Sequence, residues 1–275
     1  MVSPGPDAPD ADLLDRALAV ARDAAAAAAA IIRHYYGSAL EVRSKADASP
    51  VTLADEEAEQ AIRTVLRRAY PSHAIYGEEH GRDGGDDSGL LWLVDPIDGT
   101  KSFVRGNPMF STQIALMHHG ELVLGVSSAP AVDEVFFARR GGGAWRSTGG
   151  APPQRVQVAP TATLQRAAIS FGNLKSLAAG PGWSALAGMV READRTRGYG
   201  DYYHYHLLAR GALDLVIESD LNILDIGALA AIVREAGGVF TDLDGAPLSL
   251  DTTSALAATP PLHALALQRL HGWRA

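Results

Sequence analysis

The amino-acid sequence predicts a layered α/β protein of the α+β type with mixed sheets, on three observations. The alanine-rich segment near the start predicts a long helix over 12–36, and Gly37 suits the position just after its end. The run LLWLVD at 90–95 predicts a continuous buried strand. In the second half of the chain, strand patterns alternate with helix patterns, which is typical of sheets covered by helices.

The first half is expected to continue with a second helix and a set of strands. Asp55 lies near the first turn of that helix, and Pro71 lies beyond its end. The segment AIYGEEHG predicts a short strand followed by an acidic loop. The segment GRDGGDDSG predicts a loop on the protein surface. Two hairpins then follow, over 111–130 with the turn at His119 and Gly120, and over 133–146.

The second half is expected to begin at a shift in composition. The segment STGGAPPQ at 147–154 indicates a seam between an N-terminal metal-binding lobe, 11–148, and a C-terminal lobe, 149–275, which together form one catalytic unit. Residues 1–10 are expected to be disordered. The remaining elements are strands at 166–171, 213–219 and 239–243, and helices at 180–194, 201–211 and 225–238.

Composition excludes several classes of function. The chain has 275 residues, a formal net charge of −8 and no dense block of Lys and Arg, which argues against nucleic-acid binding. It has no cysteine, so disulfides, thiolate catalysis and cysteine-bound zinc are excluded. The polar N-terminus does not resemble a secretory signal, and Arg22 and Asp23 interrupt the longest apolar run, so we expect a cytoplasmic protein without a membrane span.

The segment VDPIDGTKS predicts a catalytic corner after the buried strand. Pro96 cannot continue a sheet ladder, so the strand is expected to end at Asp95 and the chain to bend. Asp95 and Asp98, on either side of the bend, can turn toward one point, and the Ile97 carbonyl could join them. Two such carboxylates 4 Å apart repel by roughly 4 kcal/mol at an effective dielectric of about 20. A hard divalent cation removes this repulsion, and all-oxygen ligation suits magnesium.

The residues after the corner suit a phosphate group. Asp98, Gly99 and Thr100 are expected to open a helical turn whose free N–H groups can hold a phosphate oxygen. Gly99 would let the ligand come close to the backbone. Taken alone, the two aspartates would equally suit a helix N-cap and a solvated side chain.

The whole string LVDPIDGTKSF resembles the signature of the inositol monophosphatase superfamily, which comprises magnesium-dependent, lithium-sensitive phosphomonoesterases. Three further segments resemble family motifs and occur in the expected order: KADASPVTLADEEAE, YGEEHG and LDIGALAAIVREAGG. They place Lys45, Pro50, Val51, Thr52, Asp55, Glu78, Glu79 and Asp225 in the motifs. The resemblance implies an inositol-monophosphatase-like αβαβα sandwich with mixed sheets, and a homodimer.

Each of these acidic residues also has an ordinary structural interpretation. Glu78 and Glu79 alone would suit a solvated acidic loop, Asp225 an N-cap, and Asp55 a partner of the helix dipole in a first turn. A shared metal site explains them together.

The resemblance also implies a role for each motif residue. One magnesium ion would be held by Glu78, Asp95 and the Ile97 carbonyl, and a second by Asp95, Asp98 and Asp225. A third, weaker site would use Glu78 and water, and Mn²⁺ could replace Mg²⁺. The ions would bridge the phosphate of a small phosphate monoester.

A metal-activated water is implied as the nucleophile, with no phosphoenzyme. Thr100 would orient this water, and Asp55 would accept a hydrogen bond from the Thr100 hydroxyl. Asp98, Gly99, Thr100 and Asp225 would help to bind the substrate, and Lys45 would belong to a loop near the site.

The segment 195–220 resembles the histidinol-phosphatase branch of the superfamily more than the inositol branch. Asp201 could meet a cationic amine or imidazolium, although it could also cap the helix that follows. Glu218 matches a position that contacts the leaving group in the family. Histidinol phosphate is therefore the expected substrate. Inositol 1-phosphate and another sugar or aminocyclitol phosphate are the alternatives, and a binding protein without turnover is the alternative from another class.

Three features of the second half stay open at this stage. His204 and His206, two apart on a helix, do not share a face, so we expect one core and one surface residue rather than ligands. The tyrosines in this segment could line the pocket or pack an interface; they are Tyr199, Tyr202, Tyr203 and Tyr205. Leu224 stands where the family usually has tryptophan, which could reshape the pocket.

Overall fold

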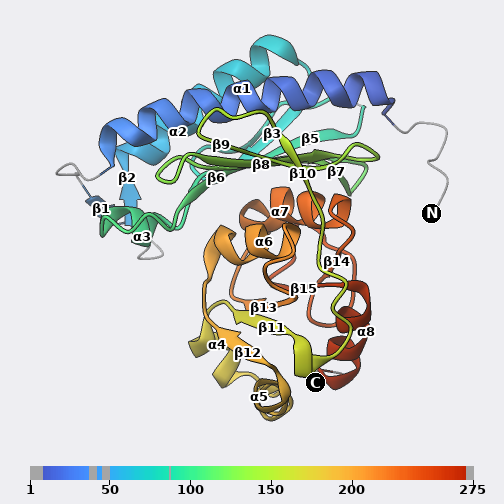
Figure 1. Cartoon of the computed structure of the whole chain (residues 1–275). Helices are drawn as coiled ribbons and strands as arrows, with labels where there is room; N and C mark the ends of the chain where they lie inside the picture. The colour runs from blue at the N-terminus through green and yellow to red at the C-terminus, as the bar shows by residue number, and fades with distance from the viewer. Residues whose placement is uncertain (1–8, 37–41, 45–49, 87, 271–275) are drawn as a thin grey trace.

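The computed structural model describes residues 9–36, 42–44, 50–86 and 88–270. Helices and sheets stack in five layers, in the order αβαβα (Figure 1). The predicted layered α/β fold with mixed sheets is confirmed. Gly37, Lys45 and the first eight residues of the expected disordered N-terminus lie outside the described residues.

The first layer consists of two helices, α1 (Ala11–Tyr35) and α2 (Leu53–Ala69). The Asp10 side chain caps α1 by accepting a hydrogen bond from the Leu13 N–H at 2.7 Å. Small alanine side chains are buried along one face of α1, which allows it to lie close to α2 and the sheet below. Two short antiparallel strands, β1 (Val42–Ser44) and β2 (Pro50–Thr52), lie between the two helices in sequence.

The second layer is an eight-stranded sheet in the order β10-β9-β8-β7-β6-β5-β3-β4, which we call the first sheet. Its strands are β3 (Ala74–Gly77), β4 (Gly81–Asp83), β5 (Leu90–Asp98), β6 (Ser111–His118), β7 (Glu121–Ala129), β8 (Glu134–Arg139), β9 (Gly143–Thr148) and β10 (Gln154–Val156). Both predicted hairpins are present, as β6–β7 and β8–β9. Only the β3–β5 pair is parallel, so the sheet is mixed.

The third layer, α6 (Asp201–Ala209) and α7 (Ile223–Glu235), lies between the two sheets. A Cβ atom at Gly125 of β7 would overlap the backbone of Ala228, so α7 packs directly on the first sheet. The prediction of one core and one surface histidine on α6 was wrong. His204 is 0% exposed and His206 1% exposed, because α6 is enclosed and leaves almost no solvent face.

The fourth layer is a five-stranded sheet in the order β12-β11-β13-β15-β14, which we call the second sheet. Its strands are β11 (Ala168–Phe171), β12 (Arg195–Arg197), β13 (Leu215–Ser219), β14 (Val239–Thr241) and β15 (Ser254–Ala258). The fifth layer comprises α4 (Leu174–Ala179), α5 (Trp183–Glu192) and α8 (Pro260–Arg269), and a short 3₁₀ turn, η1, spans Leu164–Arg166. The apolar side chains of these helices share a core with the second sheet.

The first sheet continues past residue 148, and the division into two lobes stays a prediction. Strand β10, at 154–156, pairs with β9 and still belongs to the first sheet. One apolar core joins both sheets through α6 and α7, with Leu93 and Phe136 on one side and Val216 and Ala257 on the other. In the described parts of the chain, no helix has the length and apolar character needed to cross a bilayer.

Candidate active site

The corner after the buried strand is a β-bulge. Asp95 pairs with Gln113 and Asp98 pairs with Ser111, so two residues of β5 oppose one residue of β6. The expectation that the strand ends at Asp95 was therefore wrong. Pro96 removes one ladder hydrogen bond, but the extra residue in the bulge lets the pairing resume at Asp98.

Side-chain hydroxyls satisfy the carbonyls that the bulge takes out of the ladder. The Thr112 hydroxyl donates to the Pro96 carbonyl oxygen at 2.8 Å, and the Thr100 hydroxyl donates to the Ile97 carbonyl oxygen at 2.9 Å. The Ile97 carbonyl keeps a second lone pair, so it can still act as a ligand. The corner is thus held rigidly on both sides.

Gly99 is required by the backbone at this corner. Its φ is +87°, and a Cβ atom here would lie 2.7 Å from the Met109 carbonyl oxygen. The expected helical turn follows as α3 (Thr100–Val104), with Gly99 as its N-cap. The close approach that needs glycine is therefore made by the protein itself, and Gly99 also lines the pocket.

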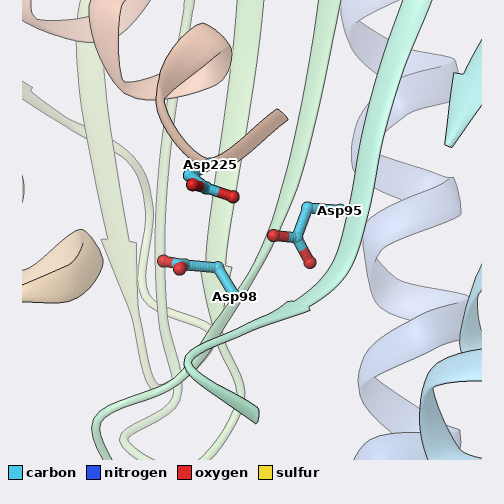
Figure 2. A group of neighbouring side chains, drawn as sticks. All are labelled: Asp95, Asp98 and Asp225. Carbon is cyan, nitrogen blue, oxygen red and sulfur yellow. The ribbon is translucent and has the colours of Figure 1, made fainter. Parts of the chain in front are cut away.

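Three aspartates meet at the corner, as Figure 2 shows. Asp95, Asp98 and Asp225 each offer an oxygen, and these oxygens all lie within 4.8 Å of one another. We call these three residues the acid cluster. Asp95 is 1% exposed, and its Oδ1 accepts no hydrogen bond from the described residues. A buried carboxylate oxygen without a donor is costly unless a cation satisfies it.

Asp225 approaches the other two aspartates from the start of α7 (Figure 2). The helix N-cap is Asn222, and Asp225 is the third helical residue of a capping box. The Asn222 N–H donates to Asp225 Oδ2 at 2.7 Å, and the Asn222 side-chain amide donates to Oδ1 at 2.9 Å. The helix start thus fixes the Asp225 carboxylate in the site, although Asp225 is not the N-cap itself.

Burial and mutual repulsion both disfavour the ionised form of the acid cluster. Burial raises the pKa of Asp95 well above its usual range, and the carboxylates of Glu78 and Asp98 raise it further. Burial, followed by the charge of Asp201, does the same to the pKa of Asp98. Burial raises the pKa of Asp225 to about 7, although the hydrogen bond from Asn222 acts in the opposite direction.

The donor set fits a hard divalent cation. Among the described residues that line the pocket, seven carry a carboxylate and none carries a basic side chain. An anionic phosphate could not enter such a pocket without bound cations. Oxygen-only donors suit Mg²⁺, Ca²⁺ or Mn²⁺ rather than a softer metal.

The acidic loop that carries Glu78 is anchored by a second buried carboxylate. Glu59 is 0% exposed and accepts hydrogen bonds from the Arg63 side chain at 2.7 Å and from the Glu79 N–H at 2.7 Å. A Cβ atom at Gly77 would overlap the Glu59 carboxylate, so glycine makes room for this anchor. Glu78 then lines the pocket beside the acid cluster.

Two walls of the pocket differ in origin. The N-terminal wall consists of Glu78, Asp95, Asp98 and Thr100, on and around the first sheet. The C-terminal wall consists of Asp201, Tyr205, Glu218 and Asp220, on α6 and at the end of β13. The structure therefore brings Asp201 and Glu218 into the same pocket as the acid cluster.

Asp201 and Asp220 both have unusual backbone conformations, with φ of +46° and +62°. Asp201 is the first residue of α6, and Gly200 occupies the N-cap position that Asp201 was considered for. The Asp220 carboxylate accepts a hydrogen bond at 2.6 Å from Asn173, which also has a positive φ, of +41°.

Two other residues that the sequence singles out do not line the pocket. Asp55 is 1% exposed in the first turn of α2, and the expected hydrogen bond from Thr100 to Asp55 stays a prediction. Leu224 is 5% exposed and packs in the core between the sheets. The aliphatic part of the lining comes instead from Ile97, Leu221, Ile226 and Leu229.

Sequence reasoning missed Asp220 and Glu59. Asp220 directly follows a strand, but nothing in the sequence distinguishes it from a surface turn residue. Glu59 lies four residues before Arg63, which predicts a helical ion pair but not its burial. Tyr205 was one of four tyrosines considered, and it is the one of the four that lines the pocket.

Comparison with known proteins decides the family. A profile of the inositol monophosphatase family matches residues 13–273. The chain belongs to the inositol monophosphatase family. It is 40% identical to the histidinol-phosphatase of Mycobacterium tuberculosis over 232 residues, 84% of this chain and 88% of that relative. It is 35% identical to the inositol-1-monophosphatase of Mesorhizobium japonicum over 222 residues, 79% and 81% of the two chains.

Comparison with solved structures agrees with membership of the inositol monophosphatase family. The extragenic suppressor protein suhB from Bartonella henselae superposes with a TM-score of 0.82 at 30% identity, covering 94% of this chain and 99% of that one. The chain is thus a phosphatase of this family, a phosphoric monoester hydrolase.

Proposed function

We propose that this inositol monophosphatase family member hydrolyses L-histidinol phosphate to histidinol and phosphate, with Mg²⁺ as its cofactor. The observation that carries the proposal is the surplus of carboxylates in the pocket. The acid cluster and Glu78 account for the expected metal ligands. Asp201, Glu218 and Asp220 remain on the C-terminal wall, with no basic side chain among the described lining residues.

A cationic leaving group suits this surplus. Burial raises the pKa of Asp201, and the negative charge of Glu218 raises it further, so a neighbouring cation would favour the ionised carboxylate. Histidinol carries an amine and an imidazole, and both can donate hydrogen bonds to carboxylates. A neutral polyol would leave the charge of this wall unbalanced.

We propose that the metal ions share some of their ligands. Glu78, Asp95 and the Ile97 carbonyl would hold one ion, and the acid cluster would hold a second. A third ion would use Glu78 and water. When bound, such ions neutralise the phosphate oxygens and lower the pKa of a coordinated water.

The chain's own residues are proposed to position the reactants. The backbone N–H groups of Gly99 and Thr100 would hold a phosphate oxygen. The Thr100 hydroxyl would orient the attacking water, and Asp55 would accept a hydrogen bond from that hydroxyl. The water oxygen replaces the ester oxygen on phosphorus without a phosphoenzyme. The released oxygen takes up a proton and leaves as the histidinol hydroxyl.

The relatives support this choice of substrate but leave a second candidate. The histidinol-phosphatase of Mycobacterium tuberculosis shares more identity with the chain than the inositol-1-monophosphatase of Mesorhizobium japonicum does. Inositol 1-phosphate is the second candidate, favoured by the latter relative. An aminocyclitol phosphate, which also carries an amine, would fit the acidic wall too. A homodimer and a cytoplasmic location stay predictions.

A panel of phosphate esters tests the proposal. Phosphate release would be measured with Mg²⁺, with and without Li⁺, for L-histidinol phosphate, its N-acetyl derivative, inositol 1-phosphate and an aminocyclitol phosphate. We expect kcat/KM for L-histidinol phosphate to exceed the other values by at least about tenfold, the worth of one charge-assisted hydrogen bond. Equal values for the free and the acetylated amine would exclude the amine as the group that the acidic wall binds and would leave the imidazole. A higher value for inositol 1-phosphate would favour the second candidate.

A further inference from the structure

The Glu218 carboxylate on the C-terminal wall is held by two buried side chains of α6. The Tyr205 hydroxyl donates to Glu218 Oε2 at 2.6 Å, and His204 Nε2 lies 3.0 Å from the same oxygen. His204 is 0% exposed and Tyr205 1% exposed. No described residue donates a hydrogen bond to the other oxygen, Oε1. One oxygen of the carboxylate is thus engaged within the protein, whereas the other has no donor in the described part of the chain and belongs to a side chain that lines the pocket.

One backbone group gives the direction of the first hydrogen bond in this network. The Tyr199 N–H can only donate, and it donates to Ser170 Oγ at 3.0 Å. The Ser170 hydroxyl is then free to donate to His204 Nδ1, 3.3 Å away. In that tautomer the imidazole proton lies on Nε2 and is donated to Glu218 Oε2. Glu218 Oε2 then accepts two hydrogen bonds, one from His204 and one from Tyr205.

A glycine on the neighbouring strand makes room for the carboxylate. Phe171 of β11 is paired with Ile217 of β13, which places Gly172 beside Glu218. A Cβ atom at Gly172 would overlap the Glu218 carboxylate at Oε1. Gly172 has no positive φ, so any residue could adopt its backbone conformation. Glycine is needed here for space and not for the turn.

We infer that His204 and Tyr205 are positioning residues which, with the space left by Gly172, fix the Glu218 carboxylate to receive a cationic group of the leaving alcohol, an ammonium or an imidazolium. The inference rests on the proposed function in naming that cation. A carboxylate held by two donors loses little conformational freedom when the ligand binds, which strengthens the contact.

The first test separates the effect on KM from the effect on kcat. Tyr205→Phe removes one hydroxyl, and His204→Leu removes both imidazole nitrogens. Each is expected to raise KM for L-histidinol phosphate about fivefold to tenfold while changing kcat less than about threefold. KM for p-nitrophenyl phosphate, whose leaving group carries no cation, should stay within about twofold. An equal rise for both esters, or no rise for either, would overturn the inference.

Matched variants control for structural damage. His204→Gln can accept from Ser170 and donate to Glu218, so it should restore most of the KM lost in His204→Leu. Gly172→Ala should raise KM as His204→Leu does, whereas Gly188→Ala should change nothing, because a Cβ at Gly188 meets no atom within 4 Å. Thermal melting verifies that each variant is folded. Tyr205→Phe decides the question if His204→Leu does not fold.

A double-mutant cycle tests the network whatever the substrate proves to be. With the ester of the panel that gives the highest kcat/KM, His204→Leu should cost less than about twofold in a Glu218→Gln background, because its effect passes through Glu218. Multiplicative losses would show that His204 acts independently, and the inference would fail. A preference of the unmodified chain for inositol 1-phosphate would instead contradict the proposed function and the cation named here, but not the coupling of His204 to Glu218.

Discussion

The two walls of the pocket hold their carboxylates in opposite ways. In the acid cluster, which joins Asp95 and Asp98 of the N-terminal wall to Asp225 of α7, burial and mutual repulsion raise the pKa values, and Asp95 Oδ1 lacks a donor among the described residues. On the C-terminal wall, the protein supplies donors itself, from Tyr205 to Glu218 and from Asn173 to Asp220. The first arrangement could hold a metal cation, whereas the carboxylates of the second are held by hydrogen bonds within the protein.

The largest expected effect comes from the acid cluster. Asp98→Asn keeps the shape of the side chain and removes the charge that would hold a cation, so Mg²⁺-dependent phosphate release should fall by at least about a thousandfold. Circular dichroism should show an unchanged fold. Activity within tenfold of the unmodified chain would remove Asp98 from the proposed chemistry.

Removal of the metal ion from the acid cluster should lower the thermal stability of the protein. After chelation, addition of Mg²⁺ at about 100 times its Kd should stabilise the protein by roughly 2.7 kcal/mol, which corresponds to about 5–10 °C in Tm. Differential scanning calorimetry measures the shift. The Asp98→Asn variant should lose most of it, and a full shift in that variant would place the ion elsewhere.

The C-terminal wall should affect substrate choice rather than turnover. Asp201→Asn removes a charge, and asparagine tolerates the φ of +46° better than alanine would. KM for L-histidinol phosphate should rise about tenfold and KM for inositol 1-phosphate by less than about threefold. Steady-state kinetics on both esters measures the difference. Equal changes in the two KM values would mean that Asp201 does not distinguish between the two leaving groups.

The smallest effect is expected from a carboxylate outside both walls. Glu134 receives hydrogen bonds from Arg146 at 2.6 Å and lies 3.1 Å from His206 of α6, so it links α6 to the first sheet. Burial alone would raise the pKa of Glu134, but His206 and Arg146 lower it to about 2. Because the folded pKa lies below the ordinary value of 4.5, Glu134 stabilises the fold above about pH 4.5.

The stabilisation of the fold by ionised Glu134 should disappear as the pH falls from about 4.5 toward 2. Glu134→Gln should therefore lower the free energy of unfolding by about 1–2 kcal/mol at pH 7, and by progressively less at acidic pH. Urea unfolding at pH 7 and pH 3 measures both values. An equal loss at the two pH values would show that the ion pair is not its source.

The sequence predicted the N-terminal wall better than the C-terminal wall for a physical reason. Asp95, Asp98 and Thr100 occur within six consecutive residues, so one short motif carries both the corner and its chemistry. The C-terminal wall depends on the pairing of β11 with β13 and on the burial of α6 between two sheets. These long-range contacts decide that both His204 and His206 are buried, and local periodicity cannot show this.

The β-bulge marks a second limit of sequence reasoning. A proline after an apolar run favours the end of a strand, so the sequence alone predicts that the strand ends at Asp95. Resumed pairing at Asp98 depends on Ser111 in β6, which the motif does not contain. The requirement for glycine at Gly172 likewise arises from a side chain 46 positions later.

The identity of the ligand between the two walls can be measured most directly by diffraction. Crystals grown with Mn²⁺ and L-histidinol, and recorded at the manganese absorption edge, would locate the ions by anomalous scattering. We predict anomalous peaks within about 2.0–2.6 Å of oxygens of Asp95, Asp98 and Asp225, with the histidinol amine or imidazole against Glu218 or Asp201. Absence of any manganese peak at these aspartates, in crystals of a protein that still releases phosphate, would contradict the account.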